Sequence, residues 1–273
     1  MLMQGKKGLI MGVANEKSIA WGIAKILFEH GAKLSFTYQG EALKKRVVPL
    51  AEKVSSKIVI PCDVSSSESI KNTFDMLKKE WGSIDFIVHA IGFSDKEELR
   101  GQYIDTSLKN FMQTMHISCY SFTEVCKAAE SMINDEGSIL TLTYYGSEQV
   151  MPHYNVMGLA KSALEASVRY IAADMGKNNV RVNAISAGPI KTLAASGIGD
   201  FRFILKWNEL NSPLKRNVTQ NEVGKTSLYL LSKLGSAVTG EVHHVDCGYN
   251  TVGMVAVDEA RGVSDLLNEY DNK

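Results

Sequence analysis

The alternation of short apolar runs with helical patterns most constrains how this chain can fold. The runs are rich in β-branched residues and read GLIMGVA, KLSFTYQ, KIVIPCDV, DFIVHAIG, SILTLTYY, VRVNAISAG and EVHHVDCG. Strands of a parallel sheet read as continuous apolar segments because helices cover both faces of the sheet. The sequence therefore predicts an α/β fold of the doubly wound kind, with a seven-stranded parallel sheet flanked by helices on both faces.

Length and composition agree with a single large domain. The chain has 273 residues, of which 45% are apolar and 22% are charged, so it can bury a substantial core. No shift in composition, internal repeat or low-complexity tract marks a boundary between domains. We expect one domain over residues 1–250, followed by a C-terminal interface segment over 251–273 that ends in a polar tail.

Charge and targeting signals exclude several classes of partner. The 30 Lys and Arg residues balance the 30 Asp and Glu residues, so the bulk charge favours neither nucleic acid nor a membrane surface. The first apolar run is too short for a secretory signal or a membrane span. We therefore expect a cytoplasmic protein that binds neither nucleic acid nor membrane. Four cysteines without C-x-x-C spacing are expected to be reduced thiols, namely Cys62, Cys119, Cys126 and Cys247.

The ends of the first two predicted strands carry groups suited to a dinucleotide. Ligands of an open parallel sheet bind beyond the carboxyl ends of its strands. There, Gly12 lets the backbone approach a ligand, and Ser18 with the Ile19 amide begins a helix that can attract a pyrophosphate. An ordinary capped turn explains this motif equally well. Gln39 ends the second strand, where it can hydrogen-bond the adenosine ribose; no basic residue follows directly, which favours NADH, although residues 44–46 are basic.

The next two strand ends are compatible with the same ligand. Asp63 can accept a hydrogen bond from an adenine amino group, or alternatively cap the following helix. Ala90, Ile91 and Gly92 are small or slender enough for a nucleotide to lie across them. His89 is interpreted as a packed strand histidine, because no second histidine or carboxylate stands at metal-ligand spacing. No metal site is predicted.

The stretch VGKTS, residues 223–227, resembles the end of a phosphate-binding P-loop. However, that motif requires glycine where Thr219 stands, and a helix start rather than a strand precedes the stretch. We therefore predict an ordinary helix there.

The stretch HYNVMGLAK contains a tyrosine and a lysine seven residues apart. Seven helical residues turn through about 700°, which predicts Tyr154 and Lys161 on one helix face, roughly 10 Å apart along the axis. Gly158 stands where an interval of four would place a lysine. Alone, such a pair is more often a surface coincidence. The preceding run supports a functional interpretation, because one of its two tyrosines must face the same cleft if the strand ends at Gly146.

Taken together, these motifs resemble a known family. The segments GVANEKSIAWGIA, HAIGF, LTLTYYG, HYNVMGLAKSALEASVRYIA, VRVNAISAGPIKTLAASGI and GEVHHVD are similar to bacterial NADH-dependent enoyl-acyl-carrier-protein reductases, a divergent branch of the short-chain dehydrogenase/reductases. The likeness runs from about Gly5 to Gly248. Its most specific part is the spacing of Tyr144, Tyr154 and Lys161, because ordinary relatives place the lysine four residues after the tyrosine. The resemblance implies a single-domain Rossmann-like fold that binds NAD.

The implied reaction is hydride transfer from NADH to a trans-2-enoyl thioester on acyl carrier protein, the final reductive step of each fatty-acid elongation cycle. The implied catalytic residues are Tyr144, Tyr154 and Lys161. Tyr154 would donate a hydrogen bond to the enolate oxygen, and Lys161 would hold the nicotinamide ribose and favour negative charge nearby. Tyr144 would orient the substrate. Whether the α-carbon proton comes from Tyr154 or from water relayed through Lys161 stays open, and a homotetramer is the implied assembly.

The resemblance also implies two sets of binding residues. The cofactor set consists of Gly12, Ser18, Ile19, Gln39, Asp63, Val64, Ala90, Ile91, Gly92, Lys161, Ile190 and Thr192. In it, Ile190 meets the nicotinamide carboxamide and Thr192 lies near the pyrophosphate. The substrate set consists of Ser94, Tyr144, Tyr154, Met157, Ile198 and Phe201, with Leu205 beside them. Core packing is the alternative for any single member of this second set.

A substrate lid is expected over about residues 192–212, with Gly197 and Gly199 as its flexible points. Arg202 and Lys206 on the lid helix are expected to face an acidic carrier protein. Two other functions remain open. One is a 3-oxoacyl or other carbonyl reductase of the same fold, against which Gly158 speaks. The other is a non-catalytic nucleotide-sensing protein, which would bind NADH without oxidising it when enoyl thioester is added.

Overall fold

The computed structural model describes residues 1–193, 195, 199–254, 256 and 260–271. Seven parallel strands form one sheet in this part of the chain, in the order β3-β2-β1-β4-β5-β6-β7. The strands are β1 (Lys7–Met11), β2 (Lys33–Tyr38), β3 (Val59–Pro61), β4 (Ile84–His89), β5 (Ile133–Thr143), β6 (Arg181–Ala187) and β7 (Val242–Val245). Each strand overlaps one of the predicted apolar runs, so the predicted parallel sheet is confirmed.

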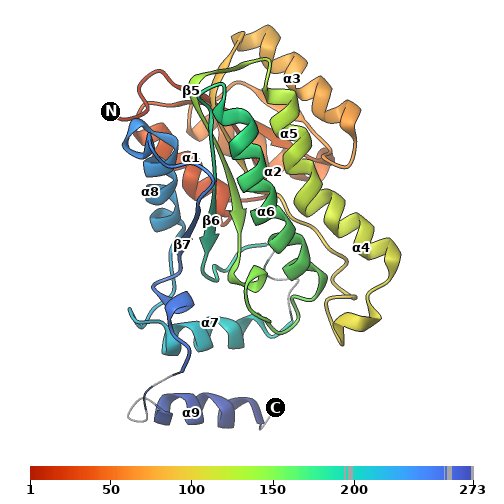
Figure 1. Cartoon of the computed structure of the whole chain (residues 1–273), viewed down its shortest axis with the longest axis vertical. Helices are drawn as coiled ribbons and strands as arrows, with labels where there is room; N and C mark the ends of the chain where they lie inside the picture. Colours follow the sequence, from red (N-terminus) through yellow and green to blue (C-terminus); the bar gives the residue numbers. More distant parts are fainter. Residues whose placement is uncertain (194, 196–198, 255, 257–259, 272–273) are drawn as a thin grey trace.

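Helices cover both faces of the sheet (Figure 1). On one face α1 (Ile19–Glu29), α2 (Gly40–Lys53) and α8 (Gln220–Leu231) share one buried apolar cluster with the strands. On the other face α3 (Ser67–Trp81), α5 (Ser121–Ala129) and α6 (Val156–Gly176) share a second cluster. Side chains of a strand point alternately to its two faces. Along β1, Ile10 accordingly joins the first cluster while Leu9 and Met11 join the second.

The remaining helices lie around the carboxyl ends of the strands. α4 (Leu108–Met115) continues through a π-helical turn (His116–Tyr120) into α5. α7 (Phe201–Asn211) crosses beyond the strand ends, and α9 (Ala260–Asp271) lies below α7 at the end of the molecule farthest from the N-terminus (Figure 1). Short 3₁₀ turns follow β5 and β7, over Tyr145–Ser147 and Tyr249–Thr251.

The order of the strands reverses direction between β1 and β4. From β1 the chain adds β2 and β3 on one side of the sheet, and then β4 to β7 on the other. Such a switch point leaves a crevice at the carboxyl ends of the two strands. Gly12 lies at this point with φ 96°, and a Cβ added there would fall 2.0 Å from the carbonyl oxygen of Ala90. Glycine is therefore required where the two strand ends approach each other.

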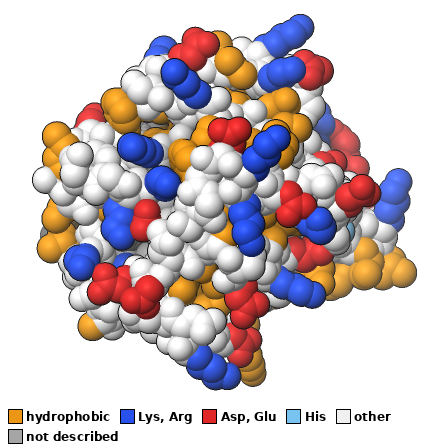
Figure 2. Space-filling view, turned by 90° about the horizontal axis from the view of Figure 1, so that it is seen from above, with side chains coloured by type: hydrophobic (Ala, Val, Ile, Leu, Met, Phe, Trp, Pro, Cys, Tyr) orange, Lys and Arg blue, Asp and Glu red, His pale blue; other side chains and the backbone are white. Residues whose placement is uncertain are grey.

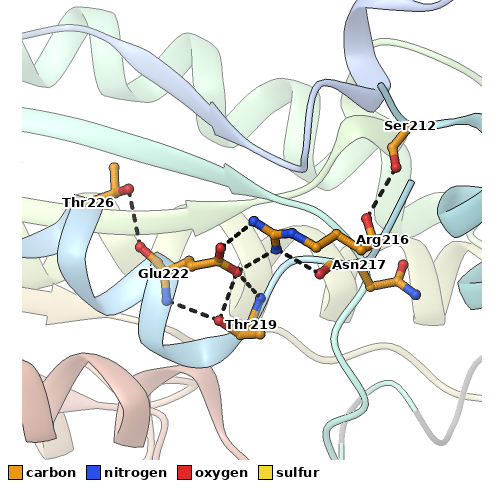
Figure 3. Close-up of polar contacts among 6 residues, drawn as sticks. All are labelled: Ser212, Arg216, Asn217, Thr219, Glu222 and Thr226. Carbon is orange, nitrogen blue, oxygen red and sulfur yellow. Dashed lines mark hydrogen bonds and ion pairs between the residues drawn. The ribbon is translucent and has the colours of Figure 1, made fainter. Parts of the chain in front are cut away.

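The predicted ordinary helix at 223–227 is confirmed as part of α8. Thr219 caps α8 in a capping box with Glu222, and Glu222 also forms two hydrogen bonds with the Arg216 guanidinium, at 3.0 and 2.6 Å (Figure 3). The Arg216 guanidinium and the Thr219 hydroxyl lower the pKa of Glu222 to about 2. This cluster anchors the connection from α7 to α8.

Within the segment after residue 250, Ala260–Asp271 forms helix α9, which the sequence analysis did not predict. Val263, Leu266, Leu267 and Tyr270 recur at intervals of three and four, which is a helical apolar stripe that the sequence prediction missed. Leu266 is 5% exposed, and the Tyr270 ring packs edge-on against Phe203 of α7 with 5.2 Å between ring centroids. The expectation of an interface segment stays a prediction.

Figure 2 shows the end of the molecule that lies opposite α9. Lys and Arg side chains are interspersed there with Asp and Glu side chains, in keeping with the balanced composition. Within the described residues, no helix combines the length and apolar character needed to cross a membrane. All four cysteines have free thiols, as expected.

Candidate active site

A cavity of about 730 Å³ lies between the carboxyl ends of the strands and α7. Of the predicted site residues, sixteen line it: Gly12, Ile19, Gln39, Asp63, Val64, Ala90, Ile91, Gly92, Ser94, Tyr144, Tyr154, Met157, Lys161, Ile190, Thr192 and Phe201. Ile198 and Gly197 lie outside the described residues. The cavity thus brings together residues from strand ends far apart in the sequence.

Ser18 is the exception among the predicted cofactor residues, because it is buried behind the cavity wall. Its hydroxyl accepts hydrogen bonds from the backbone N–H groups of Ala14 and Asn15, at 2.9 and 3.1 Å. The side chain therefore shapes the loop between β1 and α1, and it makes no capping bond to α1. Ile19, the first residue of α1, lines the cavity in its place.

Gln39 and Asp63 lie at neighbouring strand ends on one side of the cavity. The Asp63 carboxylate accepts hydrogen bonds from the hydroxyl and the N–H of Ser65, at 2.6 and 2.9 Å, and chiefly the former lowers its pKa. The alternative of a helix cap is wrong, because Ser66 caps α3. Within the basic stretch 44–46, Lys44 pairs with Glu41 at 3.3 Å, and none of the three residues lines the cavity.

The predicted common helix face for Tyr154 and Lys161 is wrong, although both side chains reach the cavity. α6 begins at Val156, so Tyr154 precedes it. Asn155 has φ 39° and His153 has φ 56°, both in the left-handed region, which interrupts the helical phase that the prediction assumed. The Asn155 side-chain amide donates to the carbonyl oxygen of Leu99 at 3.3 Å. A turn anchored to another loop therefore positions Tyr154.

The two cavity tyrosines pack against each other edge to face. The centroids of the Tyr144 and Tyr154 rings are 5.0 Å apart, with 74° between the ring planes. Burial raises the pKa of both phenols above the ordinary value, so both hydroxyls remain protonated near neutral pH and can donate hydrogen bonds. As expected from the sequence, one tyrosine of the pair after β5 faces the cavity, while Tyr145 packs against Tyr249 instead.

Two glycines leave room for this arrangement. A Cβ at Gly146 would fall 2.4 Å from the Tyr154 ring, and a Cβ at Gly158 would fall 2.7 Å from the carbonyl oxygen of Gly146. Gly158 therefore has a packing role, besides standing where an interval of four would place a lysine. It allows α6 to pack directly against the turn that follows β5, with Tyr154 between them.

Lys161 is buried at the floor of the cavity. Its Nζ donates a hydrogen bond of 2.8 Å to the Leu142 carbonyl oxygen, and burial lowers its pKa to about 8. His89 is fully buried behind it, with its ring nitrogens 3.2 and 3.0 Å from the hydroxyls of Thr141 and Ser121. Burial lowers the pKa of His89 to about 3, so this histidine is neutral and packed, as predicted. No set of three potential metal ligands clusters within the described residues.

The wall toward α7 is apolar. Phe201 and Ile204 line it from α7, so Ile204 replaces the predicted Leu205. Ser94 also lines the cavity, and its hydroxyl is held by Thr114 at 2.9 Å. The remaining apolar lining that the sequence did not predict includes Phe93, Leu99, Ile117, Met151 and Pro152. Several of these lie in loops, where no periodic pattern marks a residue as facing a cavity.

On the outer side of α7, Arg202 and Lys206 are exposed as expected. Lys206 pairs with Glu209 at 3.0 Å, so its charge is partly balanced on its own helix. Their proposed contact with a carrier protein stays a prediction.

The chain is similar to known proteins along most of its length. A family model described as enoyl-(acyl carrier protein) reductase matches residues 12–250. A relative from Rhizobium meliloti (strain 1021), named enoyl-acyl-carrier-protein reductase (NADH) 1, is 66% identical over 257 residues, covering 94% of each chain. The Anaplasma phagocytophilum reductase crystallised with NAD is 59% identical, with TM-score 0.90 over 94% of this chain and 96% of that chain. The Bacillus cereus reductase crystallised with NADP⁺ and indole naphthyridinone is 49% identical, with TM-score 0.91 over 93% and 99%.

Proposed function

Because this chain belongs to the enoyl-(acyl carrier protein) reductase family, we propose that it reduces trans-2-enoyl thioesters on acyl carrier protein with NADH, the last reductive step of fatty-acid elongation. The observation that carries the proposal is the convergence of Tyr144, Tyr154 and Lys161 on one buried cavity at the switch point of the sheet. A carbonyl reductase of this fold would place its lysine four residues after the tyrosine, where Gly158 stands.

The cavity residues at the strand ends fit a dinucleotide. Gly12 and Gly92 offer close backbone approach, the amide of Ile19 begins a helix suited to a pyrophosphate, and Gln39 and Asp63 offer acceptors for the adenosine half. On the proposed binding mode, Ile190 contacts the nicotinamide carboxamide, Thr192 lies near the pyrophosphate, and Lys161 holds the nicotinamide ribose. Bound NADH supplies the hydride. Because the Bacillus cereus relative was crystallised with NADP⁺, the preference of this chain for NADH over NADPH is to be measured.

The cavity residues would stabilise the negative charge that gathers on the thioester oxygen. The buried Tyr154 hydroxyl remains protonated and would donate a hydrogen bond to that oxygen, while the Lys161 ammonium favours negative charge nearby. Tyr144 packs on Tyr154 and would orient the enoyl group. Met157, Phe201 and Ile204 would enclose the acyl chain and exclude water.

We further propose that the reductase domain spans residues 1–250, with a lid over about 192–212, and that residues 251–273 form an interface segment. A cytoplasmic homotetramer is the proposed assembly. Large apolar side chains that lie exposed on α4 and α6 support self-association, because Leu108, Met112 and Tyr170 are 75%, 61% and 77% exposed. Light scattering of the purified chain should give the mass of four copies, and a monomer would contradict this assembly.

The decisive experiment follows NADH consumption by absorbance with crotonyl thioester, and repeats it with NADPH and with acetoacetyl thioester. We expect rapid oxidation of NADH with the crotonyl substrate, slower oxidation of NADPH, and little reaction with acetoacetyl thioester. Faster reduction of acetoacetyl thioester would identify a carbonyl reductase. Binding of NADH without consumption would identify a nucleotide-sensing protein.

A further inference from the structure

Glu165 is a buried carboxylate to which the proposed reaction assigns no role. It lies on α6 four residues after Lys161, so the two side chains share a helix face one turn apart. Glu165 is 9% exposed and Lys161 is 7% exposed. Removing either charge from water costs several kcal/mol unless it is compensated by partners. A carboxylate in this position therefore requires an explanation.

The end of β5 holds both charged side chains. The carbonyl oxygen of Leu142 accepts from the Lys161 Nζ at 2.8 Å, and the Thr143 hydroxyl donates to the Glu165 Oε1 at 2.5 Å. A short hydrogen bond from a buried hydroxyl fixes the position of the carboxylate oxygen that accepts it. Thr143 is 4% exposed and lines the cavity, so this bond lies in the wall directly behind the proposed reaction site.

The other titratable groups around Lys161 are neutral at neutral pH. His89, on β4, has a pKa lowered to about 3 by burial, and Cys119, from the turn before α5, has a pKa raised by burial. The phenols of Tyr144 and Tyr154 also have raised pKa values.

Two neighbouring groups favour the charged form of Lys161, the Cys119 thiol and the Glu165 carboxylate. Of these, Glu165 lies on the same helix, one turn from Lys161. On the outer side, Arg169 lies one further turn along α6 and is exposed.

We infer that Glu165, fixed by the Thr143 hydroxyl, is a positioning residue that keeps Lys161 protonated. The inference rests on the proposed function, in which Lys161 acts as an ammonium. An ammonium has three N–H donors, of which the bond to Leu142 uses one. A neutral amine would have fewer donors for a ribose and no charge to stabilise the oxyanion.

The proposed active form of Lys161 is the ammonium, and this determines the direction of the pH effect. The ammonium is present below the Lys161 pKa of about 8 and is lost as pH rises through it. The turnover number kcat should therefore fall over this pH range, which forms the alkaline limb of the pH profile. Removing the Glu165 charge destabilises the ammonium and moves the limb to lower pH. A carboxylate one turn away is expected to shift it by about one pH unit.

The test compares four variants with the unaltered chain across the pH range over which Lys161 loses its proton. The measured quantities are kcat with crotonyl thioester and the dissociation constant of NADH, the latter by fluorescence. Glu165→Gln should move the limb down by about one unit while retaining turnover at the acidic end. Thr143→Val should move it in the same direction by less, and Thr143→Ser, which keeps the hydroxyl, should leave it in place. Arg169→Gln is the matched control on the exposed side and should leave the limb unchanged.

An alkaline limb that does not move in Glu165→Gln would overturn the inference. An equal loss of kcat at every pH would also overturn it, because a purely structural role predicts that result. If Glu165→Gln does not fold, the comparison of Thr143→Val with Thr143→Ser decides. If the unaltered chain does not oxidise NADH with enoyl thioester, the proposed function fails. The pH dependence of NADH binding in the same variants still tests Glu165 in that case.

Discussion

Asn155 determines where the Tyr154 phenol points, although only Tyr154 itself stands out in the sequence. Asparagine tolerates left-handed backbone better than bulky residues do, and its side chain ties the turn to the loop at residues 98–101. That Tyr154 and Lys161 both reach the cavity was predictable from their spacing in a family resemblance. The geometry of this pair was not, because helical periodicity assumes an unbroken helix, and the sequence carries no signal for positive φ beyond the asparagine.

Replacing Tyr154 by phenylalanine tests the proposed hydrogen bond at the level of a single hydroxyl. Loss of one donor to a developing oxyanion should lower kcat by roughly 10²- to 10³-fold while the dissociation constant of NADH changes little. Steady-state kinetics with crotonyl thioester measure this. Tyr145→Phe is the matched control, because the Tyr145 ring packs against Tyr249 and does not line the cavity. Equal losses in both variants, or no loss in Tyr154→Phe, would contradict the assignment.

At the scale of elements, the contact between α6 and the turn after β5 depends on two residues without side chains. Gly158 on α6 lies against the carbonyl oxygen of Gly146, close enough that a methyl group would overlap it. The sequence identified the strand and the helical pattern, because apolar periodicity reports which residues are buried. It did not show how the two elements meet, since that contact involves backbone atoms that carry no periodic pattern.

Gly158→Ala should destabilise the protein by about 1–3 kcal/mol, since the new Cβ would lie 2.7 Å from a backbone oxygen that cannot rotate away. Gly176, at the other end of α6, is the matched control. A Cβ there has no neighbour within 4 Å and its φ is not positive, so Gly176→Ala should stabilise the fold by about 0.4–1 kcal/mol. Urea unfolding of both variants measures the difference. Equal stabilities would show that α6 and the turn can separate without cost.

At the scale of the whole molecule, the sheet order brings residues from distant parts of the chain to one cavity. The sequence predicted this convergence because parallel strands all end at one edge of their sheet. It did not predict the apolar loop residues of the wall, such as Leu99 and Met151, which follow no regular pattern. It also missed α9, although the spacing of Leu266 and Tyr270 contains the necessary signal.

The proposed cofactor residues follow five different strands, so bound NADH should stabilise the entire fold. At a free NADH concentration 100 times its dissociation constant, the free energy of unfolding should rise by about 2.7 kcal/mol, if NADH binds only the folded chain. Urea unfolding with and without NADH measures this, and NADPH at the same concentration should give a smaller increase. Removing NADH by dialysis should restore the original midpoint. An unchanged midpoint with NADH would contradict a cofactor site in this cavity.

Tyr154 and Lys161 stand on separate supports, one in a turn tied to a neighbouring loop and the other inside a helix. The number of residues between them therefore does not determine the distance between the phenol and the ammonium. A motif pattern for this site should therefore describe two anchors, the hydrogen-bonded turn that carries the tyrosine and the helix that carries the lysine.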